Sequence, residues 1–142
     1  MEISYFPMTE SDLPSVLDLW SHTEGVGLNE SDAPEKLRAF LDRNPSLSLI
    51  ARDGSRLIGA VLCGHDGRRG YLHHLTVIPT YRGRGVGRTM VESCLASLAA
   101  LGIVKCNVFL YVDNDPGEQF WRRCGWSARG DLKVLQRMTV GS

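Results

Sequence analysis

The sequence predicts an α/β fold of the α+β kind: a mixed, mostly antiparallel sheet of six to seven strands, flanked by about four helices. The first observation is a hairpin, since Leu47–Arg52 and Arg56–Cys63 are strand-like runs joined by an Asp-Gly turn. The second is a helix over Gly85–Leu101, along which apolar residues recur every three or four positions. The third is the order of elements around that helix, because the strand-like run Tyr71–Val77 precedes it and Val104–Val112 follows it. Strands connected in this way should be parallel neighbours.

The segment before the hairpin predicts one strand and two helices. Ile3–Phe6 is a short strand-like run, and Thr9 with Asp12 imitates a capping box that opens the first helix. Pro34 suits the first turn of a second helix, which should end before Pro45.

The segment after the long helix predicts a strand, a short helix and two last strands. Gly102 suits the position just past the end of the long helix. A short helix is expected over Gly117–Cys124, followed by strands near Trp126 and over Leu132–Val140. The order is therefore strand, two helices, three strands, helix, strand, helix and two strands. We find no repeat, linker or low-complexity segment, so we expect residues 1–142 to form a single domain.

The composition is typical of one enzyme-sized domain. Of the 142 residues 43% are hydrophobic, and 16 Lys plus Arg balance 16 Asp plus Glu. Because the formal net charge is zero, we expect no nucleic-acid partner. No apolar run approaches the ~20 residues of a membrane span, and the first residues lack a basic region followed by an apolar one. We therefore expect a cytoplasmic protein with no membrane partner.

The spacing of cysteines and histidines gives no reason to expect a metal. The four cysteines form no CxxC pair and should be small, mostly buried side chains in a reducing compartment: Cys63, Cys94, Cys106 and Cys124. His73 and His74 are adjacent, and on a regular strand their side chains would point to opposite faces. They could not then chelate one ion together, so we expect no metal.

A glycine-rich turn with two arginines joins the strand Tyr71–Val77 to the long helix. It consists of Arg82, Gly83, Arg84, Gly85, Val86 and Gly87. At a helix N-terminus the first N–H groups have no partner within the helix, and the helix dipole adds partial positive charge, so a phosphate can bind. Glycine permits positive φ, which lets successive amides converge on one anion. Tight helix packing is the alternative reason for such a turn. The turn is not a dinucleotide-binding fingerprint, because Arg88 stands where GxGxxG requires its third glycine. It is not a Walker loop either, because GxxxxGK followed by Ser or Thr is missing.

The spacing RxxGxG at Arg82, Gly85 and Gly87 resembles the pyrophosphate loop of the GNAT superfamily of N-acetyltransferases, which grips coenzyme A. The run His74–Arg82 is similar to the family's strand-loop signature. The run Asn114–Trp126 is similar to its second motif, an Asn followed by a short helix that ends in Gly and an aromatic residue. The resemblance covers residues 71–126 and implies the GNAT fold, which uses the element order predicted above.

The resemblance also implies how acetyl-CoA would bind. In the family the sheet is splayed between its fourth and fifth strands, and main-chain groups that lack a ladder partner there can bond the amides of pantetheine. The cofactor-binding residues implied on this basis are Leu75, Thr76, Val77, Arg82, Gly83, Arg84, Gly85, Val86, Gly87, Asn114 and Trp121. For Asn114 the alternative is a helix cap. For Trp121 it is packing in the core.

Acetyl transfer to an amine needs a base, because an ammonium group with a pKa of ~10.4 is protonated at neutral pH. In this family the base often projects from the strand matching Tyr71–Val77, so His73 is the candidate catalytic base. The alternative is that His73 packs within the sheet, while His74 is expected to be structural. Trp121 stands where many members have a tyrosine proposed to protonate the leaving thiolate. Tyr111 or a water is therefore expected to supply that catalytic proton.

The function implied is transfer of an acetyl group from acetyl-CoA to a primary amine of a small molecule or protein by direct attack. In the family the acceptor pocket comes largely from the first two helices with their loop, here Trp20–Pro34, and from the segment joining the last two strands. The candidate substrate-binding residues are Trp20 and Glu24 in the first of these regions and Tyr71, which shares a strand face with His73. Two alternatives stay open: a catalytically impaired acetyl-CoA-binding module, motivated by Trp121, and a protein-interaction domain without cofactor. The sequence does not identify the acceptor. A homodimer, common among enzymes of this size, is also left open.

Overall fold

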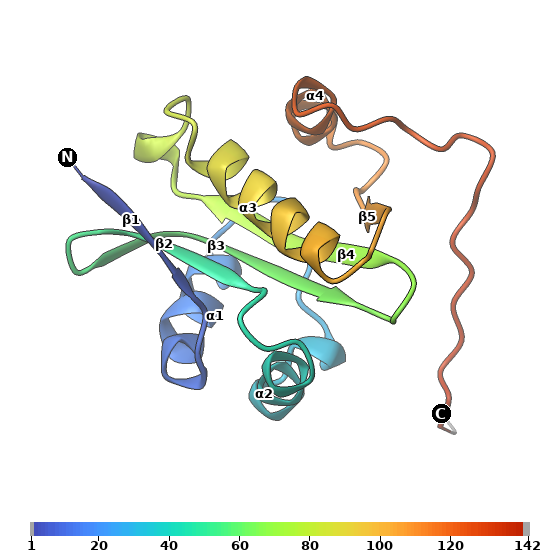
Figure 1. Cartoon of the computed structure of the whole chain (residues 1–142), viewed down its shortest axis with the longest axis horizontal. Coiled ribbons are helices and arrows are strands. Elements are labelled where there is room, and N and C mark those ends of the chain that lie inside the picture. The colour runs from blue at the N-terminus through green and yellow to red at the C-terminus, as the bar shows by residue number, and fades with distance from the viewer. Residues whose placement is uncertain (1, 141–142) are drawn as a thin grey trace. The chain divides into compact units, whose positions relative to one another are not determined.

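A computed structural model of the chain describes residues 2–140, in which helices and strands follow one another in the order drawn in Figure 1. The elements are β1 (Ile3–Pro7), α1 (Leu13–Ser21), α2 (Pro34–Arg43), β2 (Leu49–Asp53), β3 (Arg56–His65), β4 (Gly70–Val77), α3 (Val86–Ala100), β5 (Cys106–Val108) and α4 (Asp115–Arg123). Short 3₁₀ turns stand before α1, α2 and α3: η1 (Glu10–Asp12), η2 (Glu30–Asp32) and η3 (Pro79–Tyr81). The chain divides into two compact units, residues 1–111 and 112–142. The expectation of a single domain stays a prediction.

The five strands form one sheet in the order β1-β2-β3-β4-β5. All neighbours are antiparallel except β4 and β5, which are parallel. The predicted mixed sheet and its parallel pair around the long helix are confirmed. The parallel pairing is short, since it joins Gly70–Leu72 to Cys106–Val108 and then stops.

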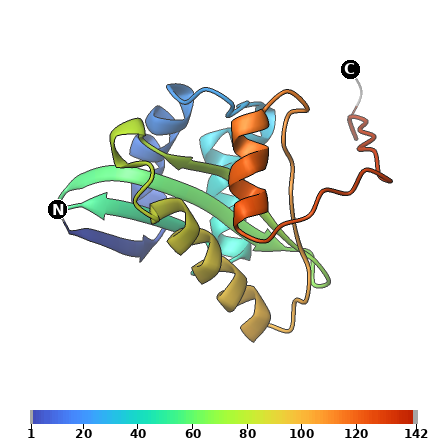
Figure 2. The ribbon, with the colours of Figure 1, turned by 90° about the horizontal axis from the view of Figure 1, so that it is seen from above.

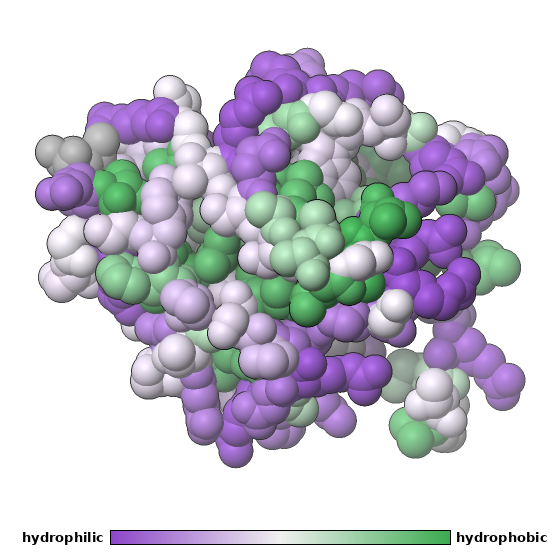
Figure 3. Space-filling model, viewed as in Figure 1, coloured by the Kyte–Doolittle hydropathy of each residue, from purple (hydrophilic) through white to green (hydrophobic). Residues whose placement is uncertain are grey.

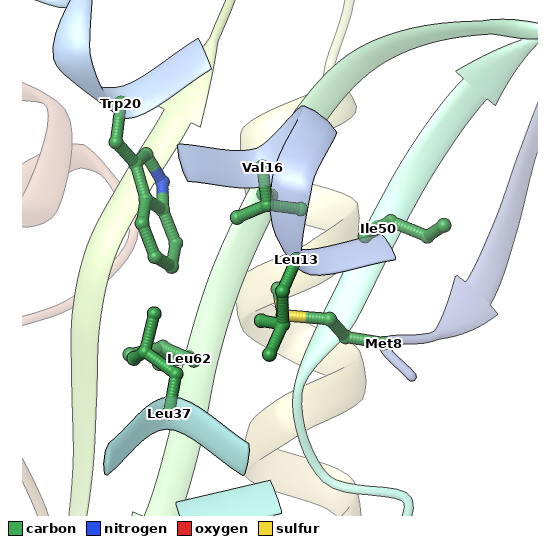
Figure 4. Close-up of a cluster of buried hydrophobic side chains, with 8 residues drawn as sticks. Met8, Leu13, Val16, Trp20, Leu37, Ile50 and Leu62 are labelled. Atoms are coloured by element: carbon green, nitrogen blue, oxygen red, sulfur yellow. The ribbon is translucent and has the colours of Figure 1, made fainter. Parts of the chain in front are cut away.

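Helices cover both faces of this sheet. Figure 2 shows α1 and α2 on one side and α3 on the other. The core between the sheet and the first two helices is a cluster of buried apolar side chains, most of them drawn in Figure 4: Met8, Leu13, Val16, Trp20, Leu37, Ile50, Ala60 and Leu62. On the opposite face α3 approaches closely because β4 begins with Gly70, where an added Cβ would stand 2.6 Å from a methyl group of Leu98.

The two N-terminal helices begin with the same device. Before α1 the Thr9 N–H donates to the Asp12 carboxylate at 2.8 Å, and before α2 the Asn29 N–H donates to the Asp32 carboxylate at 3.1 Å. Both are capping-box contacts that occupy N–H groups at the start of a helix. The predicted box at Thr9 is confirmed, although it caps a 3₁₀ turn that leads into α1.

The prediction of two last strands, near Trp126 and over Leu132–Val140, is wrong. The described residues therefore form five strands, whereas six to seven were expected. Apolar side chains in this segment are exposed: Leu132, Val134, Leu135, Met138 and Val140. The main-chain bond found there is local, from the Leu132 N–H to the Arg129 carbonyl. A strand gains stability by burying one face, and Val134 beside Leu135 breaks the alternation that would create such a face. β5 is likewise shorter than the expected Val104–Val112.

Figure 3 shows apolar residues at the surface over the C-terminal end of α3, where Leu101 and Val104 are exposed. Within residues 2–140 the longest apolar helical stretches fall short of what crossing a membrane requires.

Candidate functional site

The centre of β4 contains a one-residue bulge. Ala60 of β3 pairs with Thr76, whereas Leu62 pairs with His73, so β4 uses one residue more than β3 over the same stretch. His74 lies in this interval with φ 57, a left-handed conformation that few non-glycine residues adopt. A bulge bends its strand and redirects the side chains around it.

The bulge brings the two adjacent histidines to one face of the sheet. The His73 and His74 ring centroids lie 6.4 Å apart. The His73 ring meets Phe40 of α2 edge-on at 6.3 Å, and the His74 ring meets Trp20 of α1 edge-on at 5.0 Å. The expectation that these side chains point to opposite faces is therefore wrong, because the left-handed residue interrupts the alternation of the strand.

His74 is held by a buried carboxylate from the loop between α1 and α2. Its Nε2 lies 3.0 Å from Asp32 Oδ1, and the side chains of His74 and Asp32 are 20% and 8% exposed. Trp20 beside them is fully buried, and its indole N–H has no hydrogen-bond partner among the described residues. Asp32 escaped the sequence analysis. The spacing of Asn29 and Asp32 is that of a capping box and could have pointed to the cap, but a partner 42 residues away on an irregular strand gives no sequence signal.

His73 has an aromatic environment. Its ring lies parallel to that of Tyr71 at 6.2 Å, and the Phe109 ring is 6.4 Å away. Burial, and secondly the charge of His74, lower the pKa of His73 below its ordinary value of 6.5. The imidazole is therefore neutral at neutral pH and able to accept a proton.

One edge of β4 is open beyond the short pairing with β5. From His73 to Val77 the strand has no partner on that side among the described residues. Leu75 and Val77 are half-buried, and Thr76 is buried with its hydroxyl donating to the His74 carbonyl at 3.1 Å. The predicted splay between the fourth and fifth strands is thus present at the residues where it was expected.

The turn between η3 and α3, residues 82–87, is shaped by two left-handed glycines. Gly83 has φ 77 and Gly85 has φ 80, and an added Cβ at either would meet open space. The first bond within the helix runs from the Thr89 N–H to the Gly85 carbonyl, which leaves the N–H groups of Val86 and Gly87 without a partner in the described chain. This turn therefore presents main-chain donors at the positive end of a 15-residue helix.

Arginine side chains flank the turn. Arg82 folds back, with its Nε donating to the Val77 carbonyl at 2.9 Å. The guanidinium groups of Arg84 and Arg56 each lie 5.6 Å from the centroid of the Tyr81 ring. Both cations are therefore held near the start of α3, where they add to the attraction for an anion.

Tyr111 lies against the loop between α1 and α2. The space that a Cβ at Gly27 would take is occupied by the Tyr111 hydroxyl. Tyr111 is 61% exposed, and Glu24 of the same loop is also exposed. The structure therefore brings the loop next to Tyr111, which lies three residues beyond the end of β5.

The second unit, residues 112–142, contains the two other predicted cofactor residues. The Asn114 side chain accepts the Gly117 N–H at 3.0 Å, so it caps α4. Trp121 is buried and meets Trp126 edge-on at 4.8 Å. These are the structural alternatives considered for both residues, and contact with a cofactor stays a prediction. Throughout the part of the chain described, three or more His, Cys, Asp or Glu residues nowhere gather as a metal site.

Comparison with known proteins decides the family. A family model described as "Acetyltransferase (GNAT) family" matches residues 13–126. The chain belongs to this family. As a member it is an acetyltransferase.

Relatives match over nearly the whole chain. An acetyltransferase of Yersinia enterocolitica is 30% identical over 141 residues, covering 99% of this chain and 97% of the relative. An acetyltransferase of Sodalis glossinidius is 33% identical, covering 99% of this chain and 96% of the relative.

Solved structures share the fold. The PaiA N-acetyltransferase of Thermoplasma acidophilum, in complex with coenzyme A, matches with a TM-score of 0.75 and 23% identity over 87% of this chain and 88% of the other. Ard1 of Thermoplasma volcanium matches with a TM-score of 0.80 and 12% identity over 92% of this chain and 86% of the other. The expected GNAT fold is confirmed by these likenesses, with the smaller sheet described above.

Proposed function

We propose that this acetyltransferase moves an acetyl group from acetyl-CoA to a primary amine of a small molecule or protein by direct attack. The observation that carries the proposal is the succession of an open β4 edge and a turn that ends in the free N–H groups of Val86 and Gly87, both within residues 73–87. A carrier that combines a diphosphate with an amide-containing arm needs both features side by side.

The turn at residues 82–87 fits the diphosphate. The N–H groups of Val86 and Gly87 are free in the described chain, and open space surrounds Gly83 and Gly85. A diphosphate would satisfy these donors and interact favourably with the helix dipole and with Arg84. The solved relative from Thermoplasma acidophilum, which contains coenzyme A, supports this choice of carrier.

The open edge of β4 fits the pantetheine arm. Main-chain groups at Leu75, Thr76 and Val77 have no partner strand on the β5 side. Amides of the arm would replace the missing strand. The acetyl group would then lie near the bulge and the two histidines.

His73 is the base in this proposal. A neutral imidazole takes one proton from the ammonium group, and the free amine attacks the thioester carbon. The new C–N bond forms and the C–S bond breaks. The second proton lost by the nitrogen goes to the departing thiolate through the Tyr111 hydroxyl or a water, while the first leaves His73 for solvent. A thiol with a pKa near ~8.5 is a good leaving group, so weak acid assistance suffices.

The acceptor would approach between the loop of residues 22–33 and the aromatic side chains on β4. Tyr71 lies beside His73 there. Trp20 supports His74 from the core, and exposed Glu24 could attract a cation from the loop. Asn114 and Trp121 are assigned to the cofactor only by resemblance.

A second candidate is an acetyl-CoA-binding module without turnover. Trp121 favours it, because the position that often carries a tyrosine hydroxyl is here an indole packed against Trp126. Its N–H group donates a hydrogen bond but does not transfer a proton in the usual pH range.

Calorimetry with coenzyme A and a thiol-release assay across a panel of amines separate these functions. Gly85→Ala should raise the Kd for coenzyme A at least about tenfold, because alanine resists φ 80 and displaces the free amides. Gly67→Ala is the matched control, since Gly67 has φ 92 in the β3–β4 turn and equally open surroundings. Binding with no thiol release for any amine would favour the module. Absence of binding by the unaltered protein would overturn both.

A further inference from the structure

We propose that Asp32 and His74 form a latch that positions His73 and the bulged main chain of β4 for acetyl transfer. The proposal rests on the function proposed above and adds two positioning residues to it. Neither has to touch the acceptor. Their role is to join the loop before α2 to the one irregular point of β4.

Asp12 and Asp32 cap two helices in the same way. Comparing them separates the effect of the cap from the effect of the contact between Asp32 and His74. Both 3₁₀ turns read Glu-Ser-Asp and are followed by a proline two residues later. In each, Oδ2 of the aspartate accepts the N–H group three residues earlier, as described above for Asp12 and Asp32. The capping task therefore uses one oxygen of each carboxylate.

The other oxygen gives each aspartate a different long-range partner. Asp12 Oδ1 lies 3.0 Å from Arg52 Nη2, on the β2 side of the sheet. Asp32 Oδ1 lies 3.0 Å from His74 Nε2, at the candidate site. Asp12 thus contributes a cap and an ion pair away from the site, while Asp32 contributes a cap and the latch.

The latch is shielded from solvent. Asp32 is 8% exposed and His74 is 20% exposed on their side chains, and the fully buried Trp20 ring lies edge-on to the imidazole. A charge-assisted hydrogen bond in such surroundings is weakly screened by salt. The contacts with Asp32 and Trp20 therefore hold the His74 ring in one orientation, with Nε2 towards Asp32.

The same residue sets the course of β4. His74 adopts φ 57, which asparagine tolerates better than most residues do. His74→Asn should consequently keep the backbone of the bulge while removing the imidazole. This substitution separates the latch from the bulge itself.

The latch also acts on His73 electrostatically. The groups facing His73 are Tyr71 and His74 on β4, Phe40 on α2, Phe109 beyond β5, and Asp32 on the loop. Among them the charge of His74 lowers the pKa of His73, and the charge of Asp32 raises it. Without His74, the charge that lowers the pKa of His73 is gone, while the charge of Asp32, which raises it, remains. The pKa of His73 should therefore increase.

The test compares Asp32→Asn and His74→Asn with Asp12→Asn. Each variant is measured for kcat/KM with an amine found in the screen, for the Kd of coenzyme A, and for the NMR titration of the His73 ring. We expect Asp32→Asn and His74→Asn to lower kcat/KM by about 10- to 100-fold, as misplacement of reacting groups does. The Kd should stay unchanged, and the double variant should be no worse than the poorer single one. Asp12→Asn should keep its kcat/KM. His74→Asn should move the His73 titration and the acid limb of the pH profile to higher pH.

Two results would overturn the latch: equal kcat/KM for Asp32→Asn and Asp12→Asn, or a His73 titration that does not move in His74→Asn. Failure of the proposed acetyl transfer would be recognised by a different measurement, thiol release by the unaltered protein. If the unaltered protein releases no thiol with any amine, the acetyl-transfer proposal fails. The NMR titration still decides the latch in that case, because a raised midpoint supports it and an unmoved one contradicts it.

Discussion

The Tyr81 hydroxyl donates a hydrogen bond to the Asp53 carboxylate, and this bond ties the turn at residues 82–87 to the end of β2. The Tyr81 side chain is buried, and two guanidinium groups lie over its ring, one of them from Arg84 of the turn. The bond to Asp53 raises the pKa of Tyr81, so the hydroxyl keeps its proton. A local loop motif is therefore anchored by a residue 28 positions earlier.

Tyr81→Phe should weaken coenzyme A binding without abolishing it. Loss of the hydroxyl frees the anchor of the turn, and we expect the Kd to rise about three- to tenfold, as for one lost hydrogen bond. Calorimetry measures the change. Tyr5→Phe, on β1, is the control and should leave the Kd unaltered. A Tyr81→Phe protein with the original Kd would show that the anchor does not shape the phosphate site.

His73→Ala should lower kcat by about 10²- to 10⁴-fold, the usual contribution of a general base. Because the pKa of His73 lies below 6.5, the unaltered enzyme should lose activity only as the pH falls below 6.5, where His73 becomes protonated. Profiles of kcat/KM against pH test this. His22→Ala, which alters an exposed histidine at the end of α1, should keep the acid limb. An acid limb that persists in His73→Ala would rule out His73 as its source.

Gly27→Ala should reposition Tyr111. The new methyl group would occupy the place of the exposed Tyr111 hydroxyl, which can swing away at little cost in stability. If Tyr111 delivers the proton to the thiolate, Gly27→Ala and Tyr111→Phe should lower kcat by similar factors. Their combination should be no worse than either one, because both remove the same contact.

Thermal melting accompanies these assays and should show a Tm for Gly27→Ala close to the original. Unchanged kcat in Tyr111→Phe would assign the proton transfer to water. Additive losses in the double variant would show that Gly27 serves the acceptor loop by itself.

Gly70→Ala should destabilise the fold through α3. Its Cβ would stand 2.6 Å from Leu98 Cδ1, and overpacking of this kind costs about 1–3 kcal/mol. Leu98→Ala alone should cost about 2–5 kcal/mol through the cavity it leaves. Since the new methyl group fills part of that cavity, the double variant should lose less stability than the sum of the singles. Urea unfolding measures the three values, and simple additivity would contradict the close contact.

The sequence predicted features that depend on neighbouring residues better than features that depend on residues far apart in the chain. The turn at residues 82–87 was predictable because a strand, glycines and a helix start adjoin one another, and all three signals are local. The placement of His74 was not, because a bulge is set by the pairing of β4 with β3. Asp32 could be recognised as a cap but not as the partner of His74. The strand expected over Leu132–Val140 failed because propensity alone does not supply a partner or a buried face.

We propose that the free N–H groups of Val86 and Gly87, at the start of α3, bind the diphosphate of coenzyme A. An NMR titration of the labelled protein with coenzyme A tests it most directly, through the amide signals of Val86 and Gly87. We expect these two signals to shift first and furthest, to saturate with one equivalent, and to move with 3′-phospho-ADP as well. If they stay in place while coenzyme A binds, its diphosphate lies elsewhere and Val86 and Gly87 do not bind it.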